Sequence, residues 1–450
     1  MNGPAERTGE GEALGPLGRG PQALLTGLAG LAGSLVLSLV LSSCTLLAGD
    51  GEPTGGQTTS AQPAPRRVVA AVQRTLDLRA AGVRRQDRGR FDRALATGRP
   101  AFRAEQAQYF DNLAQLPLEV VDYRFDPADL LRVEDSYWVV VEVHLQLRGY
   151  DETPVVARDR YLFEPGGGKR QRLRLASVTD EAWEERNRVV PQPWDRGPVQ
   201  VREVAGVLGV FDDASVAAAP GLLDAAQRAV GDVSAVVPFD WSNQVVLYAL
   251  STTAALASVA DLPGGDAAAL DAVAVPVAAD PRDPDSGLAS TRIVLNPRVL
   301  ASAGAERTSA QGRTRDRLLR HEVTHVAVGA RDDDAPVWLA EGVAEWVSVR
   351  PLAPEDRALP EVALVAVRDD LAAGRVRMPE DATFNADGST AHYGLSWWAA
   401  EHLAASFGEQ VLWVLLDGAG DEAALRRLVG LGEDQLAQRA ARLMVATYDD

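Results

Sequence analysis

Two histidines and a glutamate in one short stretch have the types and spacing of a metal-dependent active site. His321, Glu322 and His325 form the pattern His-Glu-x-x-His. On a helix, residues four apart project from one face with their Cβ atoms about 5–6 Å apart, so both imidazoles can bind one zinc ion. Glu322 can then reach a water on the metal without binding the metal itself. Because the chain has only 5 histidines in 450 residues, this pairing is informative.

Two helices are expected to position these residues. In RTRDRLLRHEVTHVAV the apolar residues recur at helical steps, and a glycine follows as a typical helix end. A loop then leads into a second predicted helix, VWLAEGVAEW, with Asp334 or Ala335 as its N-cap and Pro336 in its first turn. Glu341 and Glu345 lie four residues apart on one face of that helix. Both are candidates for the third protein ligand of a catalytic zinc site.

The two segments together resemble the gluzincin family of zinc metallopeptidases, in which His-Glu-x-x-His is followed by a helix with the pattern W-L-x-E-G. The resemblance implies a zincin-like α+β fold and a Zn2+ cofactor. It also implies that Glu341 is the third ligand, beside His321 and His325. Two interpretations of Glu345 stay open, because its carboxylate either orients a histidine or faces solvent.

The reaction expected of such a site is hydrolysis of a peptide bond. Zinc lowers the pKa of bound water from 15.7 towards about 7. Glu322 takes the proton of that water as a general base and can later pass it to the leaving amine. The resemblance further implies a downstream tyrosine or histidine that stabilises the oxyanion. Tyr393 is the preferred candidate and His392 the alternative, although Tyr393 could instead only pack against the site helices. The segment Thr291–Asn296, TRIVLN, is a candidate edge strand for pairing with extended substrate.

Composition limits the classes of protein that the chain can be. At 450 residues it is long enough for two or three domains, and its 46% hydrophobic residues are enough to build their cores. Its formal net charge of -18 argues against a nucleic-acid partner, because binding to phosphate backbones requires clustered basic residues. A single cysteine allows neither an internal disulfide nor a thiolate zinc site.

The N-terminal sequence predicts export and attachment to a membrane. Arg19 precedes an uncharged stretch that ends in LSSC at Cys44, which resembles a bacterial lipobox. We therefore expect residues 1–44 to be a signal peptide with a lipidation site at Cys44. An uncleaved signal anchor is the alternative, and both place the remaining chain on the extracytoplasmic face. Residues 45–65, rich in Gly, Pro, Thr and Gln, are a predicted flexible linker.

Two folded parts are expected after the linker. Residues 66–190 are a predicted accessory α+β domain, helical to about Asp126 and then antiparallel strands, which resembles the cone-shaped nuclear-transport-factor-two-like fold. A proline-rich segment, Arg186–Pro198, is a plausible link to the second part. Residues 198–450 are a predicted zincin-like domain with a mixed sheet, mainly helical from Gly312 onward.

The sequence therefore predicts an α+β, membrane-anchored, extracytoplasmic zinc peptidase that acts on a peptide or protein substrate. The alternative is a scaffolding lipoprotein with a degenerate peptidase domain, in which zinc only braces the helices or is absent.

Overall fold

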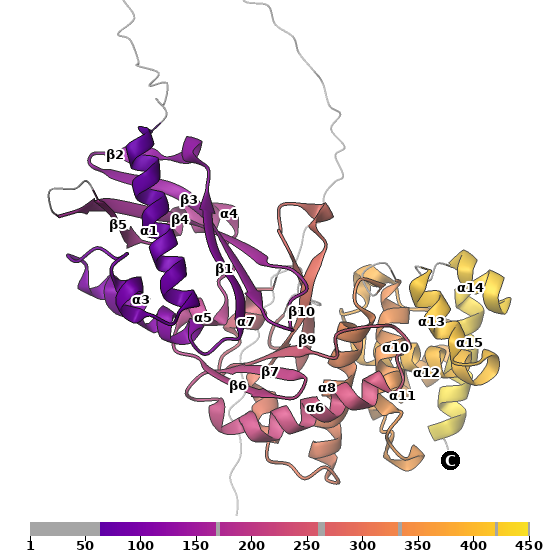
Figure 1. Cartoon of the computed structure of the whole chain (residues 1–450). Coiled ribbons are helices and arrows are strands. Elements are labelled where there is room, and N and C mark those ends of the chain that lie inside the picture. Colours follow the sequence, from indigo (N-terminus) through magenta and orange to yellow (C-terminus); the bar gives the residue numbers. More distant parts are fainter. Residues whose placement is uncertain (1–63, 168–171, 260–265, 332–334, 419–421, 449–450) are drawn as a thin grey trace, which may run out of the picture. The chain divides into compact units, whose positions relative to one another are not determined.

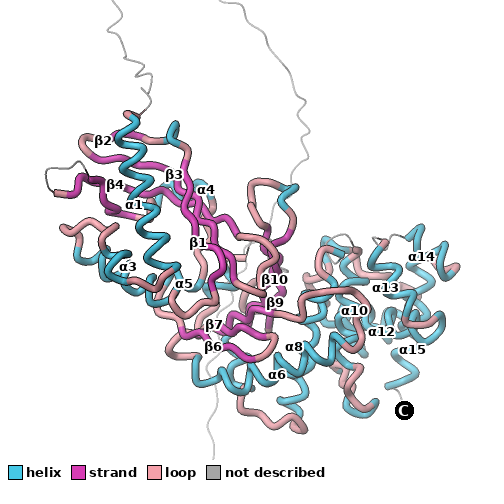
Figure 2. Tube along the Cα trace, in the orientation of Figure 1, coloured by secondary structure: helices cyan, strands magenta, loops and turns pink. Residues whose placement is uncertain are grey.

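A computed structural model of the protein describes residues 64–167, 172–259, 266–331, 335–418 and 422–448. Within these ranges the architecture is α+β, as expected, with an antiparallel sheet in the N-terminal part and helices in the C-terminal part (Figures 1 and 2). The predicted signal peptide, Cys44 and the linker up to residue 63 lie outside the described residues. No helix among the described residues combines the length and the apolar character needed to cross a membrane.

The N-terminal part consists of helices packed on an antiparallel half-barrel sheet. Its helices are α1 (Arg66–Arg84), α2 (Arg88–Asp92) and α3 (Pro100–Leu113). Its strands are β1 (Leu118–Phe125), β2 (Leu131–Val133), β3 (Ser136–Leu147), β4 (Val155–Gly166) and β5 (Arg172–Ser177). The order is β1-β3-β4-β5, and β2 pairs with β3. Helix α1 contacts both outer strands, β1 and β5, so it lies across the sheet (Figure 1).

The expectation of helix up to Asp126 is wrong for Leu118–Phe125, which forms β1. Pro117 ends the helical pattern, and the residues after it alternate between faces as a strand requires. Val121 and Tyr123 are 1% and 2% exposed and face the core. Pairing with β3 fixes this register and removes the alternative of a longer helix.

The second part begins with a mixed sheet, as expected. Its strands are β6 (Gln200–Val204), β7 (Val207–Phe211), β8 (Val245–Ala249), β9 (Ala272–Ala278) and β10 (Leu288–Leu295), in the order β6-β7-β8-β10-β9. The three inner strands are parallel, and the outer two are antiparallel to their neighbours. Every residue of β7 and β8 is buried, which accounts for their uninterrupted apolar sequences.

Both faces of this sheet are covered. One face packs on α6 (Ala219–Ser234) and on the helices that follow β10. The other face belongs to the hydrophobic core of the N-terminal part, to which it contributes Leu208, Val210, Val246, Tyr248 and Val294. Three short helices lie before β9: α4 (Glu181–Asn187), α5 (Pro193–Arg196) and α7 (Ala254–Ala257).

The prediction that Thr291–Asn296 is the edge strand is wrong. These residues belong largely to β10, which lies between β8 and β9, and β9 is at the edge. The last four residues of β10 are all buried, as suits an inner strand. Pro276 lies in β9, and proline, which has no N–H to donate, is confined to edge strands, strand starts and bulges.

The chain is mainly helical after β10, as expected (Figure 2). The helices are α8 (Ala310–Val328), α10 (Val337–Val349), α11 (Glu361–Ala372), α12 (Ser389–Phe407), α13 (Gln410–Asp417), α14 (Glu422–Val429) and α15 (Glu433–Tyr448). Helix α10 packs between α8 and α12. It approaches α12 closely at Gly342, where a Cβ atom would lie 2.5 Å from the carbonyl oxygen of Ser396. The glycine therefore allows the close packing that holds α10 in place.

Candidate metal centre

Helix α8 carries His321, Glu322 and His325 on the predicted helical segment. The Ser309 side chain caps its first turn by accepting a hydrogen bond from the backbone of Gly312, 3.0 Å away. Its apolar residues, including Leu319, Val323 and Ala327, are buried in the core. Because these residues fix the rotation of the helix about its axis, both histidines project from the remaining face, toward α10.

Helix α10 forms where it was predicted, but its cap differs from the prediction. Its N-cap is Pro336 rather than Asp334 or Ala335, and its first residue is Val337. The side chain of Asp381 replaces the expected local cap, because it accepts a hydrogen bond from the Val337 N–H at 2.9 Å. Asp334 lies outside the described residues.

The predicted ligands converge. The Oε2 atom of Glu341 lies 3.1 Å from Nε2 of His321 and 3.6 Å from Nε2 of His325. The two Nε2 atoms are 3.1 Å apart. In a tetrahedral zinc site with bonds of about 2.0–2.1 Å, ligand atoms lie roughly 3.3–3.4 Å from one another. The three donor atoms thus form a triangle of the size that one zinc ion requires.

The chemistry of these donors also fits a cation. The Nε2 atoms of His321 and His325 face one another across 3.1 Å. When one proton is shared between these two nitrogens, the Glu341 carboxylate is left unsatisfied. The Oε2 atom of Glu341 is buried and receives no hydrogen bond of ordinary geometry from the described residues. A divalent ion would satisfy all three donors at once. Among the described residues, His321, His325 and Glu341 are the only group of three or more potential ligands with this geometry.

Electrostatics in the cluster keep Glu341 negatively charged. Burial alone raises the pKa of Glu341, but its contacts with His321 and His325 outweigh burial and hold that pKa well below its usual value. Burial lowers the pKa of His321, but Glu341 and Glu345 raise it by more. The pKa of His321 is therefore above its usual value. The pocket therefore favours positive charge where the three side chains meet, as a metal site should.

Glu322 is 5% exposed and lies beside the proposed ligands. Burial raises the pKa of its carboxyl group, and the charges on His321 and His325 offset only part of this effect. The backbone of Ala274 lies near enough to lower this pKa in part, and α8 contacts the strand that carries Ala274. Ala274 belongs to β9, so the edge strand lies against the residue that was predicted to act as the base.

Glu345 faces the protein interior, and the solvent-facing interpretation is wrong. Its Oε1 atom lies 3.5 Å from Nδ1 of His321, the ring nitrogen that points away from the cluster. Its Oε2 atom accepts two hydrogen bonds from the Arg317 guanidinium, at 3.1 and 2.6 Å. Arg317 in turn stacks over Trp397 and donates to the carbonyl oxygen of Ala358. This chain of contacts fixes the position of the Glu345 carboxylate beside the histidine.

The structure brings Tyr393 to the cluster and engages His392 elsewhere. The ring centres of Tyr393 and His321 are 6.2 Å apart, and the tyrosine hydroxyl donates to the side chain of Asn385 at 3.2 Å. Burial raises the pKa of Tyr393 well above its usual value, as do the charges of nearby glutamates including Glu341. His392 instead has its Nδ1 atom 2.7 Å from the carbonyl oxygen of Phe384.

Sequence analysis missed two residues of this site. Arg317 precedes His321 by four positions, so the helical period places both on one face and could have indicated the contact. Ala274 carries no functional group in its side chain. The only sequence signal for its strand as the edge is Pro276 in AVAVPVA.

Comparisons of the chain with protein-family models, curated proteins and solved structures give no match.

Proposed function

We propose that this chain is a zinc-dependent peptidase. The observation that carries the proposal is the convergence of the His321, His325 and Glu341 donor atoms within 3.1–3.6 Å, with Glu322 buried beside them. Helices α8 and α10 supply all four residues, and the packing described above holds those helices. A bound zinc ion would supply Lewis acidity that polarises a peptide carbonyl and lowers the pKa of water.

Glu322 acts as the general base in this proposal. Its carboxylate takes a proton from the attacking water and passes that proton to the leaving amine. The raised pKa of Glu322 suits a group that must accept and then release a proton. Glu322 lies near the backbone of Ala274 in the edge strand, which lowers its pKa in part.

The outer edge of β9 supplies a surface for extended substrate. Among the described strands, β9 pairs only with β10, so its outward backbone groups are available to a peptide. A peptide paired there lies near Glu322, because α8, the helix that carries Glu322, contacts β9. Tyr393 is the donor for the developing oxyanion. A tyrosine hydroxyl is protonated at neutral pH, as a donor must be, and the raised pKa of Tyr393 is consistent with this state.

The test is Glu322→Gln in the full-length chain. Glutamine keeps the size of the side chain and removes its basicity. We therefore expect one zinc per chain to remain while hydrolysis of casein or a peptide library falls by at least about 100-fold, the scale of lost general-base catalysis. Glu361→Gln, an exposed charge change in α11, is the matched control and should retain both zinc and activity.

Three results would separate the alternatives. Full activity of Glu322→Gln would exclude this residue as the base. Failure of the unmodified chain to cut any substrate in saturating zinc, with zinc bound, would favour the scaffolding lipoprotein. Absence of zinc from the purified, zinc-supplemented chain would refute the metal centre itself.

We further propose that the protein is held at the extracytoplasmic face of the membrane through lipid on Cys44. The proposal rests on the lipobox-like LSSC, which contains the only cysteine of the chain. Cys44→Ser should abolish incorporation of a labelled fatty acid in cells and release the chain from membranes. If the variant stays in the membrane fraction, the N-terminal segment is an uncleaved signal anchor instead.

A further inference from the structure

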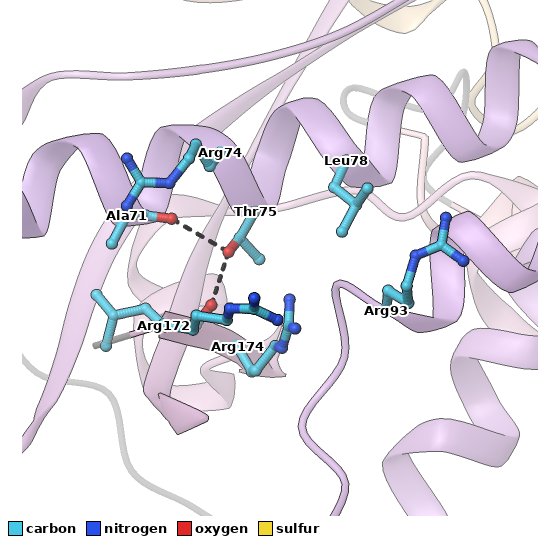
Figure 3. Close-up of a pocket in the computed structure, with 8 residues that line it drawn as sticks. Ala71, Arg74, Thr75, Leu78, Arg93, Arg172 and Arg174 are labelled. Carbon is cyan, nitrogen blue, oxygen red and sulfur yellow. Dashed lines mark hydrogen bonds between the residues drawn. The ribbon is translucent and has the colours of Figure 1, made fainter. Parts of the chain in front are cut away.

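A hollow of about 570 Å³ in the N-terminal part is lined by arginine. It lies between α1, the segment that follows α2, and β5 (Figure 3). Half of the residues that line it are arginines, namely Arg74, Arg93, Arg172 and Arg174, and none is acidic. Arg172 and Arg174 extend next to one another from β5, with Arg74 and Arg93 on either side.

Hydrogen bonds join the three segments that carry these arginines. The Thr75 hydroxyl of α1 donates to the carbonyl oxygen of Leu173 in β5, at 2.7 Å. The segment after α2 pairs with β5 through the Ala96 N–H to the Leu175 carbonyl, at 2.8 Å, and through the Leu175 N–H to the Ala94 carbonyl, at 2.9 Å. The backbone positions of all four arginines are therefore fixed before any ligand arrives.

Among the described residues, the four guanidinium groups have no partner of opposite charge. Within the described residues, no ion pair or side-chain hydrogen bond involves Arg74, Arg93, Arg172 or Arg174. Arg74, Arg93 and Arg172 are exposed and Arg174 is half-buried, so all four can reach a ligand that enters from solvent. Burial, together with the positive charges of Arg172 and Arg93, lowers the pKa of Arg174. Like charges gathered without counter-charges would be stabilised by a bound anion.

We propose that this hollow is a binding site for a compact, phosphate-bearing anion. The planar guanidinium group matches phosphate oxygens in a bidentate way, and several such groups can surround one phosphate. The volume lies in the range of small-molecule sites, about 300–1,000 Å³. The net charge of -18 repels an extended polyanion, so a compact ligand fits better than a nucleic acid. Such a phosphate belongs either to a soluble organic or inorganic polyphosphate or to a phospholipid headgroup.

The test is calorimetric titration of the full-length chain, in neutral detergent, with tripolyphosphate at physiological ionic strength. We expect Arg172→Ala/Arg174→Ala to weaken binding by at least about tenfold, since two charge-assisted contacts are lost. Arg66→Ala/Arg67→Ala is the matched control, because it removes the same charge from exposed positions of α1 outside the hollow. Arg74→Ala, on the exposed side of α1, replaces the double variant if thermal melting shows that the double variant is unfolded.

A second titration identifies the source of the phosphate. Water-soluble short-chain phosphatidylglycerol replaces tripolyphosphate, with phosphatidylcholine of the same chain length as the neutral reference. Arginine-dependent binding of either phosphate compound supports the site, and the tighter of the two identifies the ligand class. The proposal is overturned if neither compound binds, or if the hollow variant and the Arg66/Arg67 control weaken binding equally. Because the readout is binding, the result does not depend on the metal centre.

Discussion

Replacement of Glu345 by glutamine tests whether its carboxylate, beside Nδ1 of His321, strengthens zinc binding at the candidate metal centre. Glutamine preserves the shape of the side chain but removes the negative charge that lies 3.5 Å from His321 Nδ1. It also removes the charged partner of Arg317. In metalloproteins, loss of such an orienting partner weakens metal binding by about 10–100-fold.

The distance in this structure places the expected effect at the low end of that range. A separation of 3.5 Å is longer than an ordinary N–H···O hydrogen bond, so the contact is largely electrostatic. We therefore expect zinc affinity to fall by about tenfold, equivalent to about 1.4 kcal/mol. Competition for zinc with a fluorescent chelator measures this change, and Glu361→Gln serves again as the control for altered charge.

A measurement of stability completes the test. Urea unfolding of the zinc-free chain reports the separate cost of leaving Arg317 without its partner. If Glu345→Gln lowers stability but leaves zinc affinity unchanged, then Glu345 serves only to hold Arg317. The role assigned to it beside His321 would then be wrong.

Two further predictions concern charged groups away from the metal centre. Asp151→Ala should lower the free energy of unfolding by about 3–5 kcal/mol in urea titrations. The reason is that Arg292, which is 5% exposed, would lose its buried carboxylate partner. A loss near zero would show that water replaces the carboxylate. Asp159 has a pKa raised to about 8, chiefly by burial and further by the charge of Glu184, despite a backbone hydrogen bond from Arg160 that lowers it. A folded-state pKa above the unfolded value of 3.8 means that the folded protein retains this proton longer, so stability is lost as pH rises from about 4 to about 8. Asp159→Asn should flatten that part of the stability profile, measured with chelator present, and an unchanged slope would contradict the assigned pKa.

The sequence predicted those parts of the site that depend on residues close together in the chain. The spacing of His321 and His325 requires a helix to be useful, and the apolar residues around them specify one. Glu341 was identified by resemblance, and the structure places its carboxylate against both histidines. The cap of α10 was not predictable in the same way, because Asp381 reaches it from more than forty residues away.

The identity of the edge strand also depends on residues far apart in the chain, and the sequence did not predict it. Strand order depends on which strands pair, and the apolar pattern of TRIVLN is equally consistent with an edge or an inner position. The pairing order β8-β10-β9 makes TRIVLN part of an inner strand. Similarly, the strand formed by Leu118–Phe125 depends on its pairing with β3, which the local sequence does not reveal.

The mixed sheet contributes side chains to two hydrophobic cores, one on each face. Truncation of the chain between the two parts would therefore expose one of these faces. A fragment that begins near residue 198 would leave one whole face of β7, β8 and β10 in water and Arg292 without Asp151. Such newly exposed apolar surface promotes aggregation. The C-terminal half is therefore expected to need the N-terminal part to cover this face of the sheet. Truncation experiments would measure insolubility rather than the loss of an accessory activity.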